Sequence, residues 1–172
     1  MLSRREVLVG GAALCAWPVA ARADAEAATE SDSPTQEQLD SSEFAYICPL
    51  RADGTESTCH GEVWYGWIAK SIVIITSKDS WKARALARGQ RRARIWVGNH
   101  GRWKGLIFRN EAFRKAPHFD FMGLPIKNDD LLERLLALYE TKYPAEIADW
   151  RDRMRSGYAD GSRVMIRYFA TG

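Results

Sequence analysis

The segment Ser71–Thr76 constrains the fold more than any other, because it is a nearly unbroken β-branched run, SIVIIT. Such a run is typical of a strand that is buried on both faces. It leads directly into Ser77–Gly89, which is rich in Ala, Leu, Lys and Arg, with Asp79 as a suitable N-cap and Gly89 as a suitable C-terminal glycine. The sequence therefore predicts a buried strand followed at once by a helix.

Further strand-like runs on both sides of this unit predict a mostly β domain. Asp53-Gly54 is a hairpin signal between the two runs that precede it. The predicted strands are Phe44–Leu50, Cys59–Trp67, Ala93–Gly98, Lys104–Phe108 and Arg163–Phe169. Ala93–Gly98 and Lys104–Phe108 are expected to pair around the loop between them.

Two helices are predicted late in the chain. Asp129–Tyr143 has leucines at helical spacing, and Ala145–Arg155 follows Pro144, a residue that suits a helix start. Because strands and helices do not alternate along the chain, a doubly wound parallel sheet is not expected.

The first residues have the three parts of an export signal. A basic head precedes a short apolar run over Val7–Ala16, and Ala21-Arg22-Ala23 is a small-residue cleavage pattern. The head, Ser3-Arg4-Arg5-Glu6-Val7-Leu8, resembles the twin-arginine (Tat) consensus, with Val7 where that consensus usually has Phe. An ordinary Sec signal with two chance arginines is the alternative.

We therefore expect residues 1–23 to be a Tat signal peptide, with the Tat translocon as export partner and the periplasm as destination. The apolar run is too short for a stable membrane anchor. Residues 24–42, rich in Ala, Glu, Ser, Asp and Thr, are expected to form a disordered spacer, and residues 43–172 the folded domain.

The overall charge does not indicate a nucleic-acid-binding protein. The formal net charge is +3. Residues 1–23 contain three arginines and one glutamate, so their removal leaves about +1. Global composition thus gives no indication of a nucleic-acid or membrane-surface partner.

The strand-to-helix junction after Ser71–Thr76 has the chemistry of a phosphate site. Backbone N–H groups at a helix start point outward and favour an anion. Thr76, Ser77 and Ser80 add hydroxyl groups, and Lys82 adds a positive charge. The alternative is a solvated basic helix with a Ser/Thr cap.

The segment Phe44–Gly98 resembles the flavin-binding split-barrel family of pyridoxamine 5′-phosphate oxidase and its relatives. The most specific piece is Thr76-Ser77 followed by Asp79-Ser80-Trp81-Lys82-Ala83-Arg84-Ala85-Leu86, which is similar to the family's Thr-Ser-x-x-Ser-x-Lys-Ala-x-x-Leu phosphate segment. The resemblance implies a mostly β fold, a six-stranded split β-barrel with peripheral helices. It also implies a homodimer with two cofactor sites at the interface.

The resemblance assigns cofactor-binding roles residue by residue. The residues that would hold the phosphate are Thr76, Ser77, Ser80 and Lys82, and those that would lie beside the isoalloxazine are Trp64 and Tyr65. Two departures concern the phosphate: Trp81 stands where many relatives have Arg, and Gly61-Glu62 where a basic residue is expected. Arg84, Arg94 or a second subunit would compensate.

The leading interpretation is an exported FMN-dependent oxidoreductase with a small-molecule substrate. A bound flavin supplies the redox chemistry, so no acid–base pair is required; no catalytic residue is assigned. The deazaflavin F420 and haem are alternative cofactors. The alternative functions are a non-catalytic flavin or haem carrier or sensor, and a barrel that has lost its cofactor.

The cysteines and histidines leave two questions open. Cys48 and Cys59 would face each other across a two-residue Asp53-Gly54 turn, so a cross-strand disulfide is one possibility. The histidines are scattered, and there is no CxxC or HExxH motif. No metal site is therefore expected.

Overall fold

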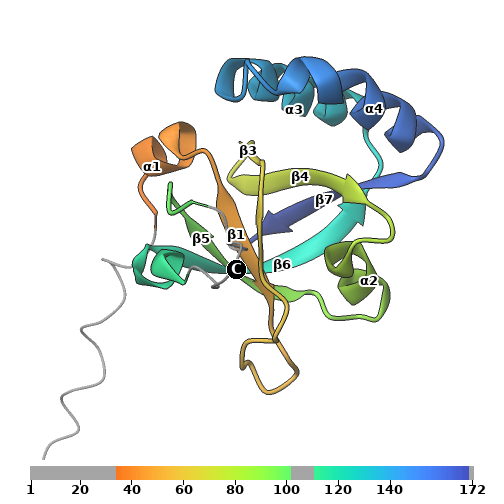
Figure 1. Ribbon diagram of the computed structural model, residues 1–172. Coiled ribbons are helices and arrows are strands. Elements are labelled where there is room, and N and C mark those ends of the chain that lie inside the picture. Colours follow the sequence, from red (N-terminus) through yellow and green to blue (C-terminus); the bar gives the residue numbers. More distant parts are fainter. Residues whose placement is uncertain (1–33, 102–110, 171–172) are drawn as a thin grey trace, which may run out of the picture.

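The computed structural model describes residues 34–101 and 111–170, which form one curled antiparallel sheet with helices around it (Figure 1). The helices are α1 (Gln36–Ser41), α2 (Trp81–Ala87), the 3₁₀ helix η1 (Ala112–Lys115), α3 (Asp129–Lys142) and α4 (Ile147–Ala159). The strands are β1 (Ala45–Pro49), β2 (Gly61–Val63), β3 (Gly66–Trp67), β4 (Ser71–Ser77), β5 (Arg92–Val97), β6 (His118–Ile126) and β7 (Arg163–Phe169).

The sheet closes on itself through β2 and β3. Among the described residues the strand order is β2-β1-β5-β6-β7-β4-β3, with every pairing antiparallel. Only Trp64 and Tyr65 separate β2 from β3, so one stretch of chain pairs with β1 at one end and with β4 at the other. Counted as one interrupted strand, β2 and β3 reduce the seven strands of the described residues to six, the number that the family resemblance implied.

Three apolar clusters fill the two sides of the sheet. One lies inside the curl and includes Ile47, Ile74, Ile95 and Ile166. A second lies between the outer face of β4 and β7 and the pair α3–α4, which Figure 1 shows together over these strands. A third, smaller cluster lies between the outer face of β1 and β5 and η1.

Most predicted elements are present, but one strand was missed and one pairing was wrong. β6 was not predicted. It pairs with one edge of β5 while β1 pairs with the other, so β5 has no edge left for the predicted partner Lys104–Phe108. That segment itself lies outside the described residues, as do residues 1–33 and with them the expected signal peptide.

The predicted spacer over residues 24–42 is wrong at its C-terminal end. Residues 36–41 form α1, which begins with a capping box between Thr35 and Gln38. Leu39 of this helix is buried in the cluster inside the sheet, and its carbonyl accepts a hydrogen bond from the Tyr65 hydroxyl at 2.7 Å. The folded unit thus begins before residue 43.

The predicted two-residue hairpin at Asp53-Gly54 does not form. The turn closes locally between Arg51 and Thr55, and the β1–β2 register pairs Ile47 with Gly61. Cys48 is buried, Cys59 is exposed, and both are free thiols. The structure therefore does not pair the two cysteines.

No helix among the described residues is long and apolar enough to cross a bilayer.

Candidate functional site

The junction between β4 and α2 carries the hydroxyl residues of the predicted phosphate site. Thr76 and Ser77 end β4, and Ser80, not Asp79, is the N-cap of α2. The Ser80 hydroxyl accepts a hydrogen bond from the Ala83 N–H at 3.3 Å, and the Ser77 hydroxyl accepts one from the Asp79 N–H at 3.2 Å. Each hydroxyl that accepts in this way keeps its own hydrogen for donation.

The Lys82 amine lies against the neighbouring indole. Its Nζ is 4.4 Å from the centre of the Trp81 ring. Burial lowers the pKa of Lys82, and the negative charge of Glu62 partly opposes this. Trp81 in turn packs over Gly61, where an added Cβ would lie 3.2 Å from the indole. The two departures noted in the sequence, Trp81 and Gly61-Glu62, thus form one contact beside Lys82.

Ser77 has a basic neighbour that the sequence did not suggest. In the β4–β7 ladder Ser77 is the register partner of Arg163. The guanidinium carbon of Arg163 lies 5.5 Å from the centre of the Trp150 ring. The two residues are far apart in the chain, so only the strand pairing reveals this hydroxyl–arginine pair.

A cavity of about 340 Å³ lies next to Arg163 on the outer face of β4. It is lined by Val63, Trp64, Ile75, Tyr139, Trp150, Met154 and Arg163. The Trp64 ring is stacked on Tyr143 at 4.5 Å between centroids and meets the edge of Tyr139 at 5.9 Å. An aromatic cavity with an arginine at its side can receive a planar ligand that carries a negative charge.

Trp64 and Tyr65 point in opposite directions, because side chains alternate along an extended chain. Trp64 faces the cavity. Tyr65 is fully buried in the cluster inside the sheet. Burial raises the pKa of its hydroxyl above the usual range, and the hydroxyl is bound to the Leu39 carbonyl. Of the two predicted aromatic residues, Trp64 lines the cavity and Tyr65 belongs to the core.

Comparison with known proteins identifies the fold. No protein-family model and no curated protein matches the sequence. A conserved hypothetical protein from Mycobacterium tuberculosis matches in structure with a TM-score of 0.51 at 17% identity, over 83% of this chain and 85% of the other. HutZ, the haem storage protein from Vibrio cholerae, matches with a TM-score of 0.51 at 11% identity, over 79% and 87%. The chain folds as a split barrel.

The two arginines expected to compensate for the departures occupy different parts of the split barrel. Arg84 is exposed in the last turn of α2. Arg94 lies on β5 and holds Asp120 of β6 through two hydrogen bonds, Nε to Oδ1 at 2.7 Å and a terminal nitrogen to Oδ2 at 2.8 Å. This pairing keeps Arg94 away from the β4–α2 junction, so Arg163 is the better candidate for an additional anion-binding residue.

Proposed function

We propose that this split barrel binds FMN and uses it for hydride or electron transfer to a small molecule. The observation that carries the proposal is the pairing of Ser77 with Arg163 beside the cavity that Trp64 lines. A flavin combines a planar ring with a phosphate, and this region combines aromatic walls with a hydroxyl and a guanidinium. A guanidinium also suits phosphate because its donors match two phosphate oxygens.

The state of Lys82 also supports a bound anion. A half-buried amine whose pKa is lowered by desolvation is stabilised in its charged form by a nearby phosphate. The resemblance of Thr76–Leu86 to the family's phosphate segment supports the same assignment. The family resemblance also supports a homodimer, and the resemblance of Ser3–Leu8 to the twin-arginine consensus supports export to the periplasm in a folded, cofactor-loaded form.

The first test is the visible absorption spectrum of the full chain purified after expression with its own N-terminus. A flavin spectrum is expected. A haem Soret band would favour the second candidate, a haem-binding protein, which rests on the likeness to HutZ. A colourless protein that also fails to bind added FMN or F420 would contradict the proposal.

The second test distinguishes the contribution of the flavin phosphate to binding from that of the ring. FMN and riboflavin, which lacks the phosphate, are titrated against the Arg163→Met variant and the Ser77→Ala/Lys82→Ala double variant. Loss of charge-assisted contacts is expected to weaken FMN binding at least about tenfold and to leave riboflavin binding nearly unchanged. Arg88→Met, at the exposed C-cap of α2, is the matched control. Equal losses for both ligands would refute the phosphate assignment.

Turnover distinguishes an oxidoreductase from a carrier. Reduction of the bound flavin by a nicotinamide or other small donor, followed by repeated reoxidation, is expected for the enzyme. A bound flavin that such donors never reduce would contradict the oxidoreductase and favour a non-catalytic flavin carrier.

A further inference from the structure

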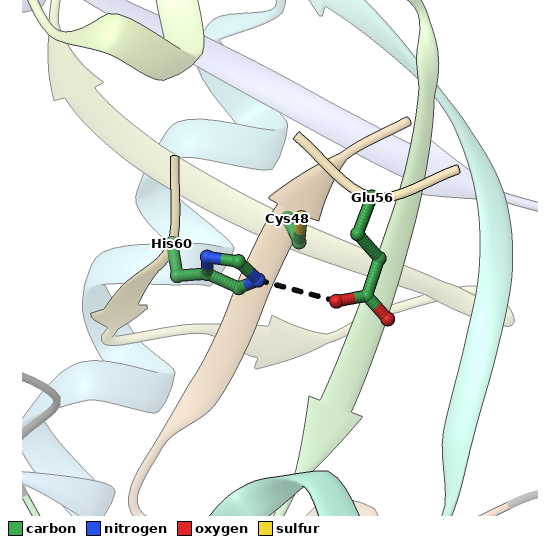
Figure 2. A group of neighbouring side chains, drawn as sticks. All are labelled: Cys48, Glu56 and His60. Carbon is green, nitrogen blue, oxygen red and sulfur yellow. Dashed lines mark hydrogen bonds and ion pairs between the residues drawn. The ribbon is translucent and has the colours of Figure 1, made fainter. Parts of the chain in front are cut away.

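A second cluster of chemically active side chains lies on the outer face of β1, under η1. The Cys48 sulfur, a Glu56 carboxylate oxygen and a His60 ring nitrogen all lie within 4.8 Å of one another. Figure 2 shows the His60 ring and the Glu56 carboxylate pointing toward each other, with Cys48 between them. Cys48 is fully buried, and the side chain of His60 is only 6% exposed.

These three groups are ligands that suit one kind of metal ion. Thiolate, imidazole and carboxylate together favour zinc, which is borderline-soft and four-coordinate. Bond lengths of about 2.0–2.3 Å in a tetrahedral site put ligand atoms roughly 3.3–3.6 Å apart. His60 Nε2 and Glu56 Oε2 are already 3.3 Å apart. Small side-chain rotations of Cys48 and Glu56 would therefore complete three corners of a tetrahedron.

The guanidinium of Arg114 already lies between Glu56 and His60. Arg114 of η1 donates a hydrogen bond to Glu56, and one of its terminal nitrogens is 3.1 Å from His60 Nε2. The space between Glu56 and His60 thus already holds one cationic group, the Arg114 guanidinium.

Arg114 has a second acidic partner to which it can turn. Its Nε donates to Glu111 at 3.1 Å, and its side chain is one-third exposed. Arg94 also approaches Glu56, at 3.4 Å, but its two hydrogen bonds to Asp120 balance its charge. Among the described residues, Arg114 is therefore the cation that a metal ion would displace, and Arg114 keeps Glu111 as a counter-ion when it leaves.

The cluster also has the protected surroundings of a metal centre. The His60 ring lies 6.4 Å from the ring of Trp96 and 6.1 Å from that of Phe113, which wall off one side. Ser57 lies beside the cysteine, with its carbonyl 3.5 Å and its hydroxyl 3.8 Å from the Cys48 sulfur. Aromatic walls and outer hydrogen bonds of this kind control solvent access and ligand orientation.

We propose that Cys48, Glu56 and His60 bind a zinc ion, with Arg114 as the group that the ion displaces. Zinc binds the thiolate, so one proton leaves Cys48 as the zinc–sulfur bond forms, and no electron is transferred. Three protein ligands leave a fourth position for water or another small ligand. The site is separate from the proposed flavin site, because the His60 ring lies near Phe113 of η1, whereas a Cβ at Gly61 would meet Trp81 of α2.

The test uses cobalt(II) as a spectroscopic probe, followed by competition with zinc. The full chain carries Cys15→Ser and Cys59→Ser, so that Cys48 is the one remaining thiol. We expect one equivalent of cobalt to give a near-ultraviolet thiolate-to-cobalt absorption together with visible bands of a tetrahedral ion. One equivalent of zinc should abolish both.

Three variants decide the assignment, with folding checked by circular dichroism. Cys48→Ser in the same background is expected to lose the thiolate absorption, and His60→Gln to weaken cobalt binding at least about tenfold. Arg114→Ala is expected to strengthen binding, because the competing cation is gone. A thiolate band that persists in Cys48→Ser would overturn the proposal. So would Arg114→Ala protein that binds no cobalt, even if Cys48→Ser fails to fold.

Discussion

Lys142 shows how a single charged residue is buried in this protein. Its Nζ donates to the Leu39 carbonyl at 3.3 Å and lies 3.7 Å from the centre of the Tyr65 ring. Burial lowers the pKa of Lys142 from 10.5 to about 8, and the charge of Asp40 partly opposes this. The Tyr65 ring also favours the charged amine. Below pH 8 the folded protein therefore holds a cation that burial penalises.

We predict that Lys142 makes stability rise with pH. Between the folded pKa of about 8 and the unfolded pKa of 10.5 the unfolded chain binds more protons, so the free energy of unfolding increases across this window and is flat below it. Lys142→Met should remove this rise and should also stabilise the protein at neutral pH.

The measurement is the urea midpoint from pH about 7 to about 9.5, a range that avoids tyrosine ionisation near pH 10. Lys127→Met, an exposed lysine just before α3, is the control and should retain the pH dependence of the wild type. A wild type and a Lys142→Met variant with parallel pH profiles would show that Lys142 is not the cause.

At the scale of elements, the sequence contains a helix-start signal for α1, but the polar composition around it outweighed that signal in the prediction. Thr35-Gln36-Glu37-Gln38 matches the capping-box pattern, and the structure contains the box. The surrounding residues are polar, and Leu39 is the only large apolar residue of the helix. A helix held by one buried leucine lacks the apolar period on which sequence prediction depends.

We predict that Leu39→Ala destabilises the protein by about 2–4 kcal/mol, as expected for a leucine removed from a packed core. Leu39 is 3% exposed and packs inside the sheet. Glu37→Ala, exposed on the same helix, should change the free energy of unfolding by no more than about 0.5 kcal/mol. Urea unfolding measures both. If the urea midpoint of Leu39→Ala equalled that of the wild type, the prediction of a disordered spacer over residues 24–42 would stand.

β6 was not predicted because its sequence contains residue types that disfavour a strand. It includes Gly123 and Pro125, residues that usually weaken a strand. Gly123 is needed at this point, since a Cβ would lie 2.6 Å from the ring of Tyr168 on β7. Contacts between distant strands thus decide the conformation. The Ser77–Arg163 pair arises in the same way, so residue types suggested the phosphate hydroxyls but not their basic partner.

At the scale of the whole molecule, the barrel depends on a short and unequal closure. The β4–β7 ladder contains seven register pairs, whereas β1–β2 contains three and β3–β4 two. Trp64 and Tyr65 interrupt the closing strand between the two short ladders. The barrel therefore has a strong wall of β4 and β7 and a weak joint at β2–β3.

We predict that native-state hydrogen exchange separates these two parts. Amides of Ile72–Ile75, in the long ladder and covered by α3 and α4, should exchange only through global unfolding. Amides of Gly61–Val63 should exchange through a local opening of lower free energy, because only three register pairs hold β2 against β1. Leu39→Ala provides the internal check: it should lower the exchange free energy of Ile72–Ile75 by its full effect on global stability. Equal exchange free energies in both parts would mean that the joint opens only when the whole barrel unfolds.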